Sequence, residues 1–260
     1  MEALRLGDVQ ETALIPLAIR ASETKRKNAR ITDQKAVEII EQLGVDTKKY
    51  DKYASHEGVV YRTVMIDREV KQTISRHPNA VCVNLGCGLD DRFTRVDNGK
   101  IRWFNVDLPD AIEVRRKVFA DTERYQSIVG DVLDPEWIKR IPEAKETIVV
   151  AEGLFMYFTR EQVQTILHSL TDNFPKGYLF VELMHPKMMN EKKHDTIKTT
   201  RAHFGWGTTS GKDLLPLDDK LNLVKEISIS DEMKAAGGLS KLFGTIIGNL
   251  NNRLDVYSWG

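Results

Sequence analysis

Short apolar runs that alternate with helical segments dominate the chain from residue 80 onward. Each run is rich in Val, Ile or aromatic residues and too short for a typical helix; they span residues 80–85, 101–106, 127–129, 147–151 and 178–183. Near-continuous apolar runs of this length are what a sheet covered on both faces requires. Because strand and helix alternate, the crossovers should be right-handed and the strands parallel. The sequence therefore predicts an α/β fold with a Rossmann-like, doubly wound, mostly parallel sheet.

The two ends of the chain have a different pattern. Residues 1–78 read as helical: Asp33 can cap a segment that Gly44 ends, and a second helix fits residues 58–76. Near the other end, residues 221–229 alternate between apolar and polar side chains, interrupted at Lys225, as a half-buried strand does. Residues 254–259 can supply its antiparallel partner. We therefore expect a C-terminal antiparallel strand pair to complete the sheet.

Composition excludes several classes of protein. Among the 260 residues, 38 Lys and Arg balance 38 Asp and Glu, so the formal net charge is zero, and a protein that holds nucleic acid usually carries a basic excess. No run of about 18 apolar residues is present to cross a membrane, and the first residues lack the order of a signal peptide. We expect a soluble, cytoplasmic protein. Cys82 and Cys87 are too far apart along an extended run to form a disulfide, and no residues have the spacing of a metal site.

A glycine turn follows the first apolar run, at Gly86 and Gly88. Two glycines one residue apart let the backbone turn tightly and approach a ligand with no Cβ in the way. A dinucleotide-binding turn would have a third glycine at position 91, but Asp90 and Asp91 stand there, and carboxylates would repel a pyrophosphate. A ligand with ribose, adenine and a cationic or zwitterionic tail, but no phosphate, fits better. S-adenosylmethionine has this chemistry.

Acidic residues end the next three strands. Asp107 closes the second strand 19 residues after Gly88, near the spacing of about 20 at which a carboxylate meets ribose hydroxyls in nucleotide folds. Asp131 follows the third strand, where it can accept from the adenine amino group, and Glu152 follows the fourth. Taken singly, Asp107 could cap the following helix and Asp131 could be a turn residue. Together they converge on one crevice at the carboxyl ends of the strands.

Four segments also resemble the leucine carboxyl methyltransferase superfamily, and within it the bacterial branch that is similar to tetracenomycin polyketide O-methyltransferases. These segments read ETALIPLAIRA (11–21), NLGCGLDDR (84–92), VDLP (106–109) and EGLFMY (152–157). The resemblance runs from about residue 11 to 186 and more loosely to the end. It implies a class I S-adenosylmethionine-dependent methyltransferase with an N-terminal helical lid (1–78), a cofactor-binding core (79–186) and a segment (187–260) that adds a substrate-side insertion and the last strands.

The resemblance also assigns roles to single residues. Gly86 and Gly88 would line the methionyl part of the cofactor, Asp107 would take the ribose, Asp131 the adenine, and Glu152 would face the methionine end. The methionine carboxylate would be met by two basic residues, Lys25 and Arg62. The neighbours of these residues complete the expected cofactor site: Cys87, Leu108 and Val132. Arg92 more plausibly pairs with a carboxylate such as Asp90 than takes part in catalysis.

Two residues are candidates for catalysis. His185 ends the fifth strand, and its imidazole could accept a proton from a substrate hydroxyl near neutral pH, unless it is a structural histidine. Tyr157 follows the fourth strand directly, where packing is the alternative role. We expect an O-methyltransferase that acts on a hydroxyl or carboxylate of a small, polyketide-like or aromatic acceptor. The alternatives are a protein C-terminal carboxyl methyltransferase and a binding module without catalysis.

Overall fold

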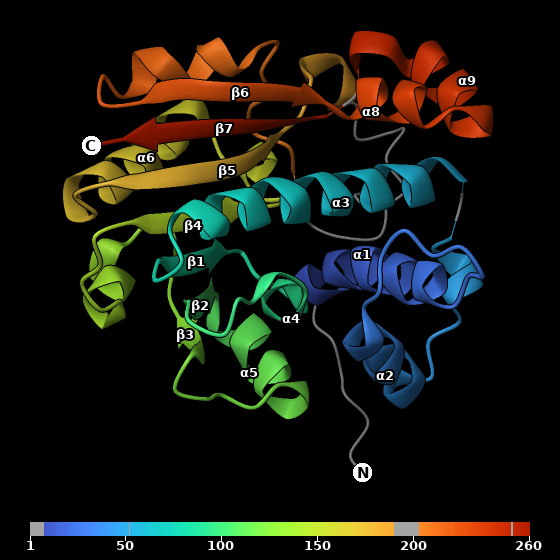
Figure 1. Cartoon of the computed structure of the whole chain (residues 1–260), viewed down its shortest axis with the longest axis horizontal. Coiled ribbons are helices and arrows are strands. Elements are labelled where there is room, and N and C mark those ends of the chain that lie inside the picture. Colours follow the sequence, from blue (N-terminus) through green and yellow to red (C-terminus); the bar gives the residue numbers. More distant parts are fainter. Residues whose placement is uncertain (1–7, 52, 190–202, 251) are drawn as a thin grey trace.

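Seven strands form one sheet in the order β3-β2-β1-β4-β5-β7-β6 (Figure 1). The computed structural model describes residues 8–51, 53–189, 203–250 and 252–260. The strands are β1 (Val81–Leu85), β2 (Arg102–Asp107), β3 (Tyr125–Val129), β4 (Thr147–Ala151), β5 (Gly177–Leu183), β6 (Asn222–Ser228) and β7 (Arg253–Trp259). Strands β1 to β5 pair in parallel, whereas β7 runs antiparallel to both β5 and β6. The predicted fold class, including the antiparallel pair at the C-terminal end, is confirmed.

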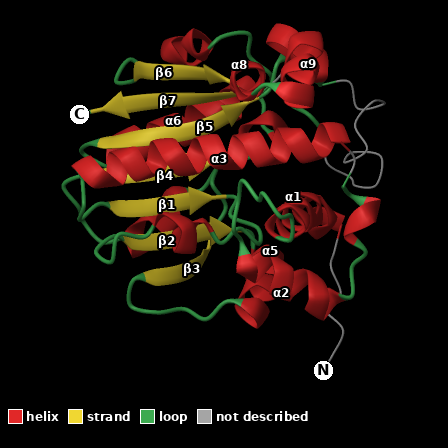
Figure 2. Cartoon of the chain, turned by 45° about the vertical axis from the view of Figure 1, so that its right-hand side comes forward, coloured by secondary structure: helices red, strands yellow, loops and turns green. Residues whose placement is uncertain are grey.

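Helices cover both faces of this sheet. The α-helices are α1 (Asp8–Thr24), α2 (Gln34–Leu43), α3 (Tyr53–Arg76), α4 (Arg92–Val96), α5 (Pro109–Val118), α6 (Arg160–Asn173), α8 (Ile229–Ala236) and α9 (Gly238–Ile247). Helix α3 crosses one face and α6 lies on the other, while α1 and α2 lie beyond the carboxyl ends of the parallel strands (Figure 2). Short 3-10 turns fill several connections: η1 (Thr47–Lys49), η2 (Pro135–Arg140), η3 (Phe155–Tyr157), η4 (Pro186–Met188), η6 (Gly211–Leu217) and η7 (Gly248–Leu250).

Local sequence signals explain both ends of α2. The Asp33 side chain accepts a hydrogen bond from Ala36 N at 2.9 Å, and Gly44 ends α2 with a left-handed φ of 61°. Helix α3 begins at residue 53, ahead of the predicted start at 58. The reason is tertiary: Glu57, in this first part of α3, is anchored by Arg30, whose Nη2 lies 2.9 Å from Glu57 Oε1. Such an anchor stabilises a first turn that the apolar pattern alone does not reveal.

Two apolar layers hold the helices to the sheet. On one face, Met65 and Val70 of α3 are fully buried in the same cluster as Cys82 and Phe180 of the strands. On the other face, the buried stripe of α6 belongs to a second cluster, which includes alternate residues of β1, β4 and β5. Because both faces are covered, the carboxyl ends of the strands are the part of the sheet left to bind a ligand.

The last two strands show why Lys225 interrupts the apolar alternation. The register between β6 and β7 shifts between Leu223 and Lys225, which marks a bulge in β6. Strand β7 lies between β5 and β6 and pairs with both along its length.

None of the helices in the described ranges is long and apolar enough to cross a membrane.

Candidate functional site

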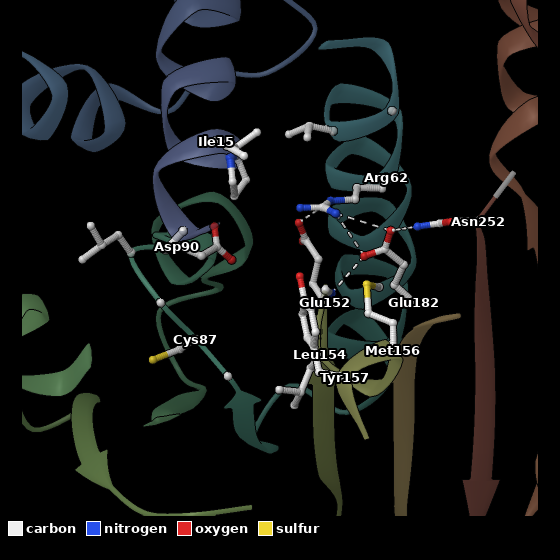
Figure 3. Close-up of a pocket in the computed structure, with 18 of the residues that line it drawn as sticks. Ile15, Arg62, Cys87, Asp90, Glu152, Leu154, Met156, Tyr157, Glu182 and Asn252 are labelled. Carbon is white, nitrogen blue, oxygen red and sulfur yellow. Dashed lines mark hydrogen bonds and ion pairs between the residues drawn. The ribbon is translucent and has the colours of Figure 1, made fainter. Parts of the chain in front are cut away.

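A cavity of about 390 Å³ opens at the carboxyl ends of the parallel strands (Figure 3). The strands and the turns after them contribute Asn84, the glycine turn, Asp107, Glu152 and Glu182. Two helices line the cavity from beyond the sheet: α1 with Ala13, Ile15, Pro16 and Arg20, and α3 with Ser55, Gly58, Val59 and Arg62. Residues far apart in the sequence therefore meet in one place, as the row of acidic strand ends predicts.

The glycine turn forms one wall of the cavity. Gly86 and Gly88 have φ values of +60° and +46°, a left-handed conformation that favours glycine. A Cβ on Gly86 would lie 2.7 Å from Leu154 Cδ1, so no larger residue fits there without a shift. Conformation therefore favours glycine at both positions, and at Gly86 space favours it as well. Cys87, between the glycines, is buried and free, and burial raises the pKa of its thiol.

Asp107 fixes this turn to the end of β2. Its Oδ2 accepts a hydrogen bond from Gly88 N and its Oδ1 accepts one from Leu108 N, both at 2.8 Å. Burial raises the pKa of Asp107, while these two backbone N–H groups oppose the rise. The residue does not cap the following helix, since the N-cap of α5 is Leu108 without a side-chain bond. A carboxylate has about four acceptor positions, so two remain for a ligand.

Arg62 and two carboxylates form the floor of the cavity. Arg62 Nη1 donates to Glu182 Oε2 at 3.1 Å, and Arg62 Nε lies 2.8 Å from Glu152 Oε1 in an ion pair (Figure 3). Although burial disfavours the charged form of Glu152, the Arg62 and Arg92 guanidinium groups hold its pKa below the usual value. Arg62 lines the cavity, and its side chain is 18% exposed. Its guanidinium group is suited to an anionic group of a ligand.

A second arginine supports the same floor from behind. Arg92 is 1% exposed and forms ion pairs with Asp67 at 2.7 Å, Asp90 at 2.9 Å and Glu152 at 2.5 Å. The structure thus contains the predicted pairing of Arg92 with Asp90. Burial and the arginines act in opposite directions on Asp90, and the arginines prevail, so its pKa is lowered. Asp90, one of the two acidic residues of this turn, is therefore part of a neutralised cluster.

Lys25 does not reach the cavity, which corrects the predicted placement. Its side chain is 55% exposed, and its Nζ lies 2.7 Å from Glu41 Oε1. The helix turns Arg20 toward the cavity instead, with Pro16 one turn earlier on the same face. Arg20 lies in segment 11–21, which carries the family resemblance, so its helical spacing from Pro16 was the signal in the sequence.

Three other predicted cofactor residues lie beside the cavity and do not line it. Asp131 is exposed and accepts a hydrogen bond from Leu133 N at 2.9 Å, Val132 is buried in the core, and Leu108 is 40% exposed. The role of Asp131 in adenine binding stays a prediction.

Glu182, which lines the cavity, was not predicted from the sequence. A single carboxylate within the apolar run 178–183 was its signal, because a charge in a buried strand needs a partner.

The remaining wall of the cavity is apolar. Tyr157 lines it and stacks on Phe204, with ring centroids 5.8 Å apart and 21° between the ring planes. Three thioethers lie in the same wall: Met156, Met184 and Met188. His185 does not line the cavity; its Nδ1 accepts from Lys187 N at 3.2 Å, and partial burial and nearby cations lower its pKa.

The charges of the lining indicate which ligands fit. Among the described lining residues, four carboxylates (Asp90, Asp107, Glu152 and Glu182) face two guanidinium groups (Arg20 and Arg62). This balance disfavours a pyrophosphate and favours a ligand with a cationic centre and one anionic group. The bare glycine turn, the spare acceptors of Asp107 and the guanidinium group of Arg62 fit S-adenosylmethionine on these grounds.

Comparisons with known proteins agree with this chemistry. Residues 13–171 match the model of a protein family described as leucine carboxyl methyltransferase. The tetracenomycin polyketide synthesis O-methyltransferase TcmP of Streptomyces glaucescens is 28% identical over 216 residues, which cover 82% of this chain and 80% of that protein. The S-adenosyl-L-methionine-dependent methyltransferase dpfgK of Gibberella zeae is 26% identical over 187 residues, 65% of this chain and 62% of that protein. The structure of magnesium protoporphyrin IX methyltransferase from Synechocystis PCC 6803 with bound SAH has a TM-score of 0.54 at 9% identity, covering 80% of this chain and 88% of that one.

Proposed function

Because the chain belongs to the leucine carboxyl methyltransferase family and is an S-adenosylmethionine-dependent methyltransferase, we propose that it methylates an oxygen atom of a small molecule. The relative TcmP, named as an O-methyltransferase of polyketide synthesis, supports this choice of acceptor atom. The observation that carries the proposal is the division of the cavity into a charged floor and an apolar wall. The charged floor can bind a charged cofactor, and the apolar wall can bind an apolar acceptor body.

The charged part of the cavity is the proposed cofactor site. Gly86 and Gly88 would lie along the methionyl chain, Asp107 would accept from the ribose hydroxyls, and Glu152 would balance the amino group. The guanidinium group of Arg62 would pair with the methionine carboxylate. The bound cofactor supplies a sulfonium methyl group that is already activated for transfer. The protein would then hold the acceptor oxygen in line with that methyl group and exclude water from the site.

The apolar wall is the proposed acceptor site. Tyr157, Phe204 and the three methionines present aromatic and polarisable side chains, which suit an aromatic or polyketide-like body. No histidine is among the described residues of the lining, and burial raises the pKa of Tyr157, so this phenol stays neutral near pH 7. A hydroxyl acceptor requires a base, whereas a carboxylate does not. Of the two oxygen acceptors, this lining favours the carboxylate.

A methyl-transfer assay tests the proposal. The purified chain would be incubated with S-adenosylmethionine that carries a labelled methyl group and with matched pairs of aromatic carboxylates and aromatic alcohols. We expect label in the ester of at least one carboxylate, with a rate that is nearly flat between about pH 6 and 8 because no base titrates. In a parallel incubation with a peptide that ends in leucine, label found only in that peptide would favour protein carboxyl methylation. Cofactor binding without label in any acceptor would favour a binding module.

A further inference from the structure

Gly58 lies in the interior of α3, four residues before Arg62. Glycine is the least favourable residue for a helix interior apart from proline, because it loses the most backbone freedom. A helical glycine is usually explained by a left-handed φ or by a close neighbour that leaves no room for a Cβ. Neither explanation applies here. Gly58 is not among the glycines with positive φ.

Space around Gly58 is open in the part of the chain that the structure describes. A Cβ built on it would meet no atom within 4 Å. Gly244, in α9, shows the contrast: a Cβ there would lie 2.7 Å from Ser230 O and 2.8 Å from Met233 Cβ. Gly244 is therefore required by packing between α8 and α9, whereas no protein atom in the described ranges requires a glycine at 58.

The open space beside Gly58 belongs to the cavity. Ser55, Gly58, Val59 and Arg62 have the spacing of one helix face, and all four line the cavity. Gly58 lies one turn, or about 6 Å along the axis, from Arg62 toward the start of α3. Across the cavity from α3, Ile15 of α1 also lies farther from the sheet than Arg62 does (Figure 3). The cavity thus continues past Arg62 into a space bounded by two helices.

We propose that the missing side chain of Gly58 makes room for the apolar body of the acceptor, so that Gly58 determines how large an acceptor the enzyme takes. This inference rests on the proposed function, in which the cofactor occupies the charged floor near Arg62. Ile15, Pro16 and Val59 surround the space with aliphatic groups, and the bare backbone at Gly58 allows a flat ring system to lie against the helix.

Three variants test the size limit. Gly58→Ala adds one methyl group and Gly58→Leu fills more of the space, while Gln72→Leu adds the same side chain to an exposed position of α3 that does not line the cavity. The dissociation constant of S-adenosylhomocysteine would be measured by calorimetry. Binding of benzoate, 2-naphthoate and anthracene-2-carboxylate to the S-adenosylhomocysteine complex, and their methylation with S-adenosylmethionine, would then be measured for each variant.

We expect wild type and Gln72→Leu to bind the larger carboxylates alike. In Gly58→Leu, the affinity for anthracene-2-carboxylate should fall at least about tenfold relative to benzoate, with cofactor affinity within about twofold of wild type. Gly58→Ala should raise the melting temperature by about 2 °C, because alanine is the better helix former and meets no clash. Gly58→Ala should also have a size limit between those of wild type and Gly58→Leu, so the test stays valid if the leucine variant folds poorly.

The proposal is overturned if Gly58→Leu and Gln72→Leu share one size profile, if wild type binds none of the three carboxylates, or if Gly58→Ala lowers the melting temperature. A Gly58→Leu variant that loses cofactor binding in parallel would also overturn it. Failure of the proposed function has a different signature, since wild type would then bind the carboxylates with the expected size limit and transfer no methyl group to them.

Discussion

Arg62 and Glu182, 120 residues apart in the sequence, meet at 3.1 Å in the floor of the cavity. Glu182 also accepts hydrogen bonds from Gly153 N at 2.9 Å and from Asn252 Nδ2 at 2.6 Å (Figure 3). One buried carboxylate thus joins α3, the turn after β4 and the start of β7. Arg62, which is proposed to bind the methionine carboxylate, is therefore held in place by Glu182, the same residue that joins these elements.

Replacing Arg62 should therefore affect both stability and binding. Arg62→Met keeps most of the side-chain length but leaves Glu182 as an uncompensated buried charge, which should lower the free energy of unfolding by about 3 kcal/mol. Urea unfolding measures this loss. Arg68→Met is the control in α3: Arg68 is 38% exposed, and Lys225 still pairs with its second partner Glu69, so the loss of its pairs with Glu232 and Glu69 should cost less than about 1 kcal/mol. Equal losses in the two variants would contradict the central role of Arg62.

Asp107 should contribute directly to cofactor affinity. Asp107→Ala removes the acceptors proposed for the ribose and also releases Gly88 N, which together should weaken S-adenosylhomocysteine binding by about 1–3 kcal/mol, or roughly 5- to 150-fold. Calorimetric titration gives the dissociation constant. Glu113→Ala, at a 73% exposed position of α5, should leave it unchanged. An Asp107→Ala variant with wild-type affinity would remove this residue from the site.

His185 should not be needed for a carboxylate acceptor. Its imidazole lies outside the cavity lining and is partly exposed, so His185→Ala should keep turnover on an aromatic carboxylate within about twofold of wild type. On an aromatic alcohol, the sequence-based role as a base predicts a slower rate. Initial rates with both acceptors decide between the two. A large loss on the carboxylate would place His185 in the transfer step after all.

Asp255 should make stability depend on pH. It is fully buried in β7, and burial together with Glu226 raises its pKa to about 7, although Arg253 opposes the rise. Because the folded state then binds the proton more tightly than the unfolded state, its contribution to stability is largest below about pH 4 and is lost as the pH rises to about 7.

Asp255→Asn should remove this dependence. We expect it to stabilise the chain by about 2 kcal/mol at pH 8 relative to wild type, with little gain at pH 4. Urea unfolding across this pH range measures both. Asp219→Asn, at an exposed position, serves as the control. A gain for Asp255→Asn that does not change with pH would show that Asp255 is not the group that titrates.

Much of the fold follows from short-range patterns in the sequence. The apolar runs predict β1 to β5 to within about two residues, and the predicted cap at Asp33 marks a real helix start, because each signal depends on neighbours a few residues away. The glycine turn and the acidic strand ends are equally local. The parallel sheet then brings Gly86, Asp107 and Glu152 together without further information.

The helical side of the site was harder to predict. Arg20 lies on the face of α1 that lines the cavity, whereas Lys25 follows the last residue of this helix and pairs with Glu41. Which basic residue reaches the cavity depends on how α1 packs against other elements, and the local sequence does not specify this. Glu182 carries no motif, since its partners Arg62 and Asn252 come from distant segments. Long-range charge pairing is the information that the sequence pattern lacks.

Calorimetric titration of the folded chain with S-adenosylmethionine tests the central claim most directly. We predict one saturable site per chain, weakened in both Asp107→Ala and Arg62→Met and unchanged in Glu113→Ala. A titration without saturable heat, or an affinity that neither variant alters, would contradict the assignment of the cavity at the strand ends to this cofactor.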